Sequence, residues 1–253
     1  MVKIRQHRVA TVLACSVLAL AAVASAQGPH RLSGDDVSPA ICGVLEMPAS
    51  PGPHPGVVLL HGAGGWRPGY ARLARVLADS GFVVLALDYY SETGLATAPW
   101  QWQRMWPEWQ GTVRGAVRWL GEQPSVSAQR IGLVGFSFGA FLAVSVASSM
   151  PSVKAVVDYY GGANTTTKSM EEQVRNFPPL LILHGEADAE VPIRYAHELS
   201  EAVTNNGGEV ELHIYPGARH GFDGRFGPNY SEAAAVDSFR RTVEFLERRL
   251  TNR

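Results

Sequence analysis

Runs of apolar residues alternate along this chain with segments in which apolar residues recur at the spacing of a helix. The runs that predict strands are Ile41–Met47, Gly56–Leu60, Phe82–Leu87, Ile131–Phe136, Val153–Tyr159, Leu180–His184 and Val210–Tyr215. Several of them contain no polar residue, and a strand that is apolar throughout must be buried on both faces. The chain is therefore predicted to form an α/β fold, with a mostly parallel central sheet and helices on both faces.

Helices are predicted between these strands. Their apolar positions fall within Tyr70–Leu77, Val113–Leu120, Phe138–Ser148 and Tyr195–Val203, and a closing helix carries Val236, Phe239, Val243, Leu246 and Leu250 on one face. In sheets of this kind, ligands bind at the carboxyl ends of the strands. The motifs described below all follow predicted strands, so they are expected to meet at that edge.

Composition excludes several classes of protein. The formal net charge is −1, so nothing in the charge supports nucleic-acid binding. The two cysteines, Cys15 and Cys42, are too few for a disulfide framework or a Cys-rich zinc site, and Cys42 is expected to be a small buried apolar residue. No metal and no organic cofactor is predicted. The sequence leaves the oligomeric state open.

The first 26 residues have the features of a secretory signal peptide. Lys3, Arg5 and Arg8 precede the apolar run Val9–Val23, and Ala24-Ser25-Ala26 provides a small-residue cleavage site. The run is shorter than the ~20 residues needed to cross a bilayer, which argues against the alternative of a retained membrane anchor. Residues 27–253 are then expected to form one domain in the periplasm or outside the cell.

A candidate nucleophile lies in Gly135-Phe136-Ser137-Phe138-Gly139, which fits the pattern G-x-S-x-G. It stands between a predicted strand and a predicted helix, which is the context that this pattern requires. Such a turn is sharp, and glycines on either side of the serine avoid steric clashes. The turn also leaves the Phe138 N–H at a helix start, where it can donate to an oxyanion. The competing interpretation is an ordinary glycine-rich turn with an idle serine.

A serine hydroxyl needs a histidine as its base, and the histidine needs an orienting carboxylate. In folds with this nucleophile turn, the order along the chain is serine, acid, histidine. The loops after the last two predicted strands supply Asp188 and His220 as acid and base, with Glu186 or Glu190 as alternative acids.

Three other histidines are less suitable as the base. His184 and His213 lie on or at the ends of predicted strands, where packing or a backbone hydrogen bond is expected of them. His197 falls inside a predicted helix and is expected to be solvated. His220 follows the last predicted strand and is flanked by Gly221, which is where the fold requires its base.

The segment Leu60-His61-Gly62-Ala63-Gly64-Gly65 follows the first fully apolar run. It is similar to the HG-rich loop that supplies a second oxyanion donor in esterases. Ala63 is the predicted donor and Gly64 the alternative, while His61 is expected to hold the loop in place. A phosphate-binding loop is disfavoured, because neither of the usual glycine spacings is present.

These motifs together resemble those of the dienelactone hydrolase family of α/β-hydrolases. The resemblance runs from about Gly56 to Leu250 and is carried by the nucleophile turn, by Val156–Gly161, by His184–Asp188 with Val191-Pro192, and by Tyr215–Phe222. It implies the α/β-hydrolase fold and a nucleophile, an acid and a base at Ser137, Asp188 and His220.

The chain departs from that family pattern at two points. The founding members use a cysteine nucleophile and a nearby glutamate, whereas this chain has Ser137 and His61-Gly62-Ala63 at the matching places. The family's arginines that hold a substrate carboxylate have no clear counterpart here, and Arg104 and Arg225 are candidates only. Dienelactone itself is therefore not the expected substrate.

Four tryptophans, Trp100, Trp102, Trp106 and Trp109, follow the second fully apolar run. They could form an apolar wall or lid over the substrate, and Tyr89, which follows the same run, is expected to line the pocket. Alternatively, the helical spacing of Trp102, Trp106 and Trp109 predicts rings that pack into the core. The sequence does not decide between the two.

The sequence therefore predicts a serine hydrolase that cleaves carboxylic esters of small molecules. A peptidase for short peptides is the first alternative, although such enzymes usually carry a further gating domain. A non-catalytic binding protein on a hydrolase scaffold is the second alternative, and the complete set of serine, aspartate and histidine argues against it.

Overall fold

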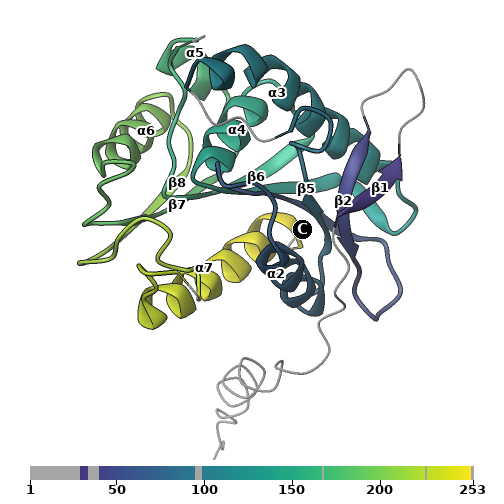
Figure 1. Ribbon diagram of the computed structural model, residues 1–253. Coiled ribbons are helices and arrows are strands. Elements are labelled where there is room, and N and C mark those ends of the chain that lie inside the picture. Colours follow the sequence, from purple (N-terminus) through teal and green to yellow (C-terminus); the bar gives the residue numbers. More distant parts are fainter. Residues whose placement is uncertain (1–28, 34–39, 95–98, 167, 226, 252–253) are drawn as a thin grey trace, which may run out of the picture.

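A single eight-stranded sheet forms the centre of the molecule (Figure 1). The computed structural model describes residues 29–33, 40–94, 99–166, 168–225 and 227–251. The predicted signal peptide lies outside these residues. Among the helices described, none has both the length and the apolar character needed to span a bilayer.

Six strands of the sheet are parallel: β3 (His54–Leu60), β4 (Val83–Leu87), β5 (Val126–Phe136), β6 (Val153–Tyr159), β7 (Leu180–Gly185) and β8 (Val210–Tyr215). Antiparallel β2 (Ile41–Glu46) and β1 (His30–Ser33) complete one edge, so that the order is β1-β2-β4-β3-β5-β6-β7-β8. The mostly parallel sheet is thus confirmed. Strand β1 was not predicted, because its sequence is polar and only its pairing with β2 makes it a strand.

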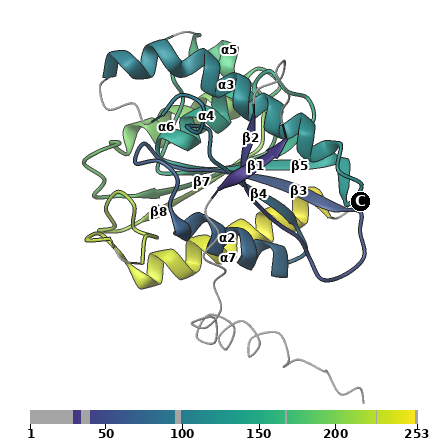
Figure 2. The same cartoon turned by 45° about the vertical axis from the view of Figure 1, so that its right-hand side comes forward.

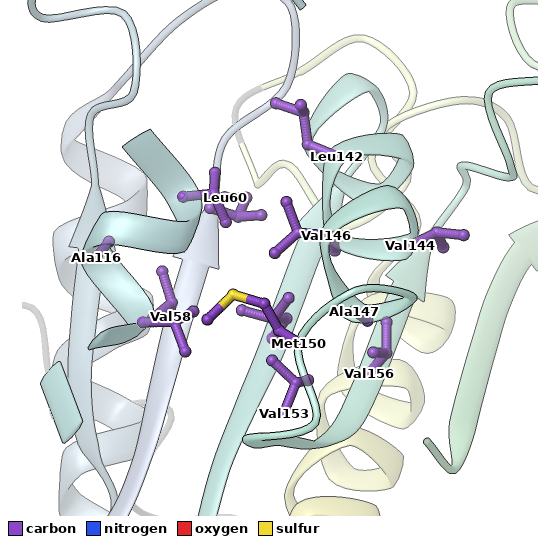
Figure 3. Close-up of a cluster of buried hydrophobic side chains, with 14 of the residues drawn as sticks. Val58, Leu60, Ala116, Leu142, Val144, Val146, Ala147, Met150, Val153 and Val156 are labelled. Atoms are coloured by element: carbon purple, nitrogen blue, oxygen red, sulfur yellow. The ribbon is translucent and has the colours of Figure 1, made fainter. Parts of the chain in front are cut away.

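Helices cover both faces of the sheet, as predicted. Figures 1 and 2 show α2 (Pro68–Asp79) and α7 (Glu232–Leu250) on one face, and α3 (Pro99–Gly121), α4 (Phe138–Ala147), α5 (Met170–Val174) and α6 (Arg194–Asn205) on the other. A hydrophobic core lies on each face of the sheet, and alternate residues of β3 belong to one or the other. Val58 and Leu60 pack with α3 and α4, whereas Val57 and Leu59 pack with α2 and α7. Figure 3 shows the first of these cores, where Val58 and Leu60 face side chains of α4.

Two expectations about burial were wrong. Val236 was expected on the buried face of the closing helix but is 52% exposed. The buried face of α7 includes Ser238 and Thr242 instead, whose hydroxyls donate to carbonyls of their own helix at 3.0 Å and 2.9 Å and so tolerate burial. Cys42 was expected to be buried and is half-buried, because it lies on β2 near the edge of the sheet.

The register of the sheet brings the predicted motifs to one edge. Leu60 at the end of β3 is paired with Gly135 of β5, and Phe136 with Tyr159 of β6. Farther along the sheet, Gly185 at the end of β7 is paired with Tyr215 of β8. The loops after β3, β5, β7 and β8 therefore open at the same carboxyl edge.

Close packing of the loop after β3 onto the start of α4 requires a glycine at position 139. A Cβ there would collide with the carbonyl oxygens of Leu60 and His61, which are backbone atoms and cannot move aside as a flexible side chain can. We expect Gly139→Ala to lower the free energy of unfolding by about 1–3 kcal/mol or more, because overpacking forces the backbone apart. Urea unfolding followed by circular dichroism measures this change.

Gly111, inside α3, provides the matched control. Apart from its chain neighbours and the backbone of its own helix, no atom lies within 4 Å of the position that its Cβ would take. Gly111→Ala should therefore raise the free energy of unfolding by about 1 kcal/mol, which is the difference in helix propensity. An unfolding midpoint for Gly139→Ala equal to that of the wild type would contradict the packing argument.

Candidate functional site

Ser137 stands at a strained turn between β5 and α4. Its backbone has φ 53° and ψ −120°, in the left-handed region that residues other than glycine rarely adopt. Its N–H donates to the Tyr159 carbonyl at 2.8 Å, which ties the turn to the neighbouring strand. The turn is the one that G-x-S-x-G predicted, and it raises the serine above the carboxyl edge of the sheet.

His220 joins Ser137 to Asp188. Its Nε2 lies 2.9 Å from Ser137 Oγ, and its Nδ1 lies 2.7 Å from Asp188 Oδ2. The other carboxylate oxygen of Asp188 accepts the N–H groups of Glu190 at 2.9 Å and Val191 at 2.8 Å. Three residues far apart in the sequence thus form one continuous chain of hydrogen bonds.

The surroundings of Asp188 keep it ionised. Burial by itself would raise the pKa of this carboxyl, but hydrogen bonds from His220 and from the two amides outweigh burial, so the pKa is lowered. An ionised carboxylate at Nδ1 holds the proton of the neutral imidazole on that nitrogen, which leaves Nε2 free to accept.

The alternative acids occupy other places. Glu186 accepts the Gly217 N–H at 3.1 Å, and the carboxylate of Glu190 lies 3.9 Å from Nε2 of His220, on the side away from Asp188. Only Asp188 is hydrogen-bonded to Nδ1 within the part of the chain that the structure describes.

The other histidines lie where their positions in the sequence suggested. Buried His184 donates from Nε2 to the Val191 carbonyl at 2.8 Å, and burial lowers its pKa. His213 contacts Arg241 at 3.2 Å, and His197 is exposed on α6. None of the three contacts Ser137 among the described residues.

The loop after β3 lies against the serine. A Cβ on Gly62 would be 3.5 Å from the Ser137 Cβ, and a turn from Gly62 to Gly65 closes with a 3.1 Å hydrogen bond. Within the described ranges, the N–H groups of Phe138, Ala63 and Gly64 donate to no other protein atom. These free donors at the nucleophile are the arrangement expected of an oxyanion hole.

His61 and Tyr89 support this loop from behind. The His61 ring stacks on Tyr89 at 3.9 Å and donates from Nδ1 to the Gly62 carbonyl at 2.9 Å. The Tyr89 hydroxyl donates to the His61 carbonyl at 2.6 Å. Tyr89 was predicted to line the substrate pocket, but it is only 1% exposed and packs beneath the loop. Sequence position alone did not reveal which way its ring points.

Tyr160 and Asp223 hold His220 from the side, and sequence reasoning did not identify them. The Tyr160 ring meets the His220 ring edge-on at 4.7 Å, and its hydroxyl donates to Asp223 Oδ1 at 2.6 Å. Asn229 donates to the His220 carbonyl at 2.9 Å. The available signal was their position in the sequence: Tyr160 immediately follows β6, and Asp223 comes three residues after His220.

The tryptophans of α3 pack around Phe138. The rings of Trp102, Trp106 and Trp109 lie 5.3 Å, 5.4 Å and 5.3 Å from the Phe138 ring. Trp106 and Trp109 are buried, so the core interpretation holds for them, while Trp102 is half-buried. The packing fixes Phe138, whose N–H is one of the free donors at Ser137.

The two candidate arginines are exposed. Arg104 lies on α3 and Arg225 on the loop after β8, and neither forms an ion pair among the residues described. The described residues also contain no cluster of three or more His, Cys, Asp or Glu side chains that could hold a metal ion.

Asp158, at the end of β6, is a buried carboxyl that forms no ion pair with any residue that the structure describes. Its Oδ1 accepts the Gly161 N–H at 2.7 Å, while its Oδ2 has no hydrogen-bond partner among the described residues. Burial raises its pKa to about 7, and the Gly161 N–H only partly opposes that effect.

Known proteins resemble this chain over most of its length. A profile of the dienelactone hydrolase family matches residues 41–250. Carboxymethylenebutenolidase of Rhodococcus opacus is 29% identical over 233 residues, which are 88% of this chain and 90% of that protein. A solved structure of a putative dienelactone hydrolase from Klebsiella pneumoniae has a TM-score of 0.74 at 21% identity, covering 87% of this chain and 97% of that one.

A shorter match involves thioesterases. Acyl-coenzyme A thioesterase 1 of Mus musculus is 33% identical over 142 residues, which are 56% of this chain. This stretch is only 32% of the thioesterase, so the chain spans about a third of that relative's length.

The buried Asp158 generates a prediction about stability. Because its folded-state pKa is about 7 and its unfolded value is near 4, the folded protein holds a proton that the unfolded chain releases between these pH values. The folded state thus binds more protons, and its stability should fall as pH rises from about 4 to 7. Asp158→Asn should abolish this loss, which is on the order of 2–4 kcal/mol.

Thermal and urea unfolding at pH 4 and pH 8 measures the effect. The asparagine keeps the oxygen that accepts from Gly161, so the variant should be more stable than the wild type at pH 8 and differ little at pH 4. Equal pH dependence in the two proteins would show that Asp158 is ionised in the folded state.

Proposed function

The chain belongs to the dienelactone hydrolase family and is a hydrolase, and from this premise we propose that it cleaves carboxylic esters of small molecules through an acyl-enzyme intermediate on Ser137. The observation that carries the proposal is the chain of hydrogen bonds from Asp188 through His220 to Ser137, at 2.7 Å and 2.9 Å. A serine nucleophile needs a hydrogen bond to its base, and the base needs a second hydrogen bond to the acid that orients it. Both contacts are present here.

In the proposed reaction, Ser137 Oγ attacks the ester carbonyl while His220 Nε2 takes the hydroxyl proton. The carbonyl oxygen becomes an oxyanion, which accepts hydrogen bonds from the Phe138 and Ala63 amides. His220 then gives its proton to the departing alcohol, and the acyl group stays on Ser137. Water, activated by His220 in the same way, releases the acid and restores the serine.

Asp188 has two tasks in this scheme. It keeps the neutral imidazole in the tautomer with its proton on Nδ1, and it stabilises the imidazolium that forms after proton transfer. The lowered pKa of Asp188 supports both tasks, because the carboxylate remains ionised at neutral pH. The amides of Glu190 and Val191 prevent it from rotating away from His220.

The half-buried rings of Trp102 and Phe138 support an apolar wall for the acyl or aromatic part of the substrate. The thioesterase match supports a second class of leaving group, because a thiolate departs from the same tetrahedral intermediate. No metal or organic cofactor takes part in these steps. If residues 1–26 direct export, the enzyme acts in the periplasm or outside the cell.

The nucleophile assignment predicts that Ser137→Ala will lower kcat for p-nitrophenyl acetate by at least ~10⁴-fold. Asp188→Asn should lower it by a similar factor, because the imidazole would then favour the wrong tautomer. Ser91→Ala, at an exposed serine, is the matched control and should keep wild-type activity. Circular dichroism verifies that each variant is folded, and wild-type turnover in Ser137→Ala would overturn the assignment.

A second experiment separates the proposed hydrolase from the alternatives. A fluorophosphonate probe should label the wild type and not Ser137→Ala, since only an activated serine reacts. The labelled enzyme should cleave p-nitrophenyl esters of increasing acyl length and the corresponding thioesters much faster than peptide p-nitroanilides. Preference for the anilides would indicate a peptidase, and failure to label would indicate a binding protein.

A further inference from the structure

Glu190 places a second carboxylate beside His220. Its Oε2 lies 3.9 Å from Nε2, the nitrogen that faces Ser137 Oγ at 2.9 Å. The two carboxylates differ in setting, because the Asp188 side chain is fully buried and that of Glu190 is 69% exposed. Asp188 thus approaches His220 from the protein interior, and Glu190 approaches from the solvent side.

The backbone of Glu190 is fixed although its side chain faces solvent. Its N–H donates to Asp188 Oδ1 at 2.9 Å, so the same loop that positions the buried acid also positions the exposed carboxylate. This backbone hydrogen bond fixes the point from which the exposed Glu190 side chain extends toward the imidazole.

No lysine or arginine of the described ranges forms an ion pair with the Glu190 carboxylate. Among the described residues, His220 is the only partner within 4 Å of Glu190 in an ion pair. The nearest arginine in sequence, Arg194, lies over the Tyr195 ring at 4.9 Å. Arg67 forms no ion pair with Glu190 either, and its guanidinium lies beside Gly64 on the loop after β3.

The leaving group must meet this charge. In the proposed reaction the departing oxygen takes its proton from His220 Nε2, so it passes the atom that Glu190 adjoins. Resting on that proposed function, we infer that Glu190 makes the enzyme select substrates by the charge of the leaving group: cationic alcohols are favoured and anionic ones disfavoured.

The expected size of the effect follows from Coulomb's law. A unit charge on the leaving group, about 6 Å from the carboxylate, changes the rate by about threefold if water screens it fully. The factor reaches about a hundredfold at the lower effective dielectric constant of a protein surface. Because Glu190 is exposed, the lower part of this range applies, and added salt should reduce the effect.

Three acetate esters of similar shape test the inference: acetylcholine, neutral 3,3-dimethylbutyl acetate and anionic 3-acetoxypropanoate. Release of acetic acid is followed by pH-stat titration, which gives kcat/KM for each ester. The wild type should prefer them in the order cationic, neutral, anionic. Glu190→Gln should lower the ratio of cationic to anionic kcat/KM at least fivefold, and Glu190→Lys should reverse the order.

Glu198→Gln is the matched control, since it removes the same charge from an exposed position within α6. It should keep the wild-type ratio, which shows that net charge alone does not produce the selection. In the wild type, 0.5 M salt should reduce the ratio.

The outcomes separate this inference from the proposed function. Turnover of the esters with a ratio in Glu190→Gln within twofold of the wild type would overturn the inference alone. No turnover of any of the three esters by the folded wild type would overturn the proposed function, and the charge selection with it.

Discussion

The close contact between the loop after β3 and the turn between β5 and α4 is the constraint on which the site depends. It is possible only because Gly139 leaves room for the carbonyl oxygens of Leu60 and His61. The same contact holds Ser137 at φ 53° and sets free amides beside it. Strain of this kind persists only where the surrounding packing over-determines the backbone. Here the packing is provided by two apolar cores, by the Tyr89 hydroxyl, and by the aromatic rings around Phe138.

The four carboxyl groups near His220 and β6 are chemically alike, but their surroundings shift their pKa values in different directions or leave them exposed to solvent. Asp188 is buried with three hydrogen-bond donors and stays ionised, whereas Asp158 is buried with one donor and its pKa rises to about 7. Asp223 is half-buried against Tyr160, and desolvation raises its pKa as well. Glu190 carries its charge in solvent. The first of these arrangements suits the orienting acid of a proton relay, and the last places a negative charge where a substrate approaches from solvent.

Sequence reasoning predicted every strand except β1, most of the helices and the meeting of Ser137, Asp188 and His220, because each of these signals was strong. Fully apolar runs indicate parallel strands, and the nucleophile pattern occurred in its required context between strand and helix. Val236, Cys42 and Tyr89 were misplaced, since the depth of a side chain depends on neighbours that are distant in sequence. Asp223 and Asn229 belong to no motif, and Tyr160 lies in the family motif Val156–Gly161 without a role that the motif reveals, so only folded geometry shows that they contact or position His220. The choice between Asp188 and Glu190 as the acid was open for the same reason: both follow β7 within a few residues.

What the sequence determined by itself was the order of the elements and the edge at which the polar motifs gather. The order of the elements follows from the spacing of apolar residues, which is a local rule. The shared edge follows from the alignment of the carboxyl ends of parallel strands, which is a rule of topology. Tertiary structure alone decided which carboxylate faces Nδ1 of His220 and which one faces Nε2, which tryptophans are buried, and which amides remain free. These depend on distances of a few ångströms between segments far apart in the chain, and such distances are set by packing, which no local pattern encodes.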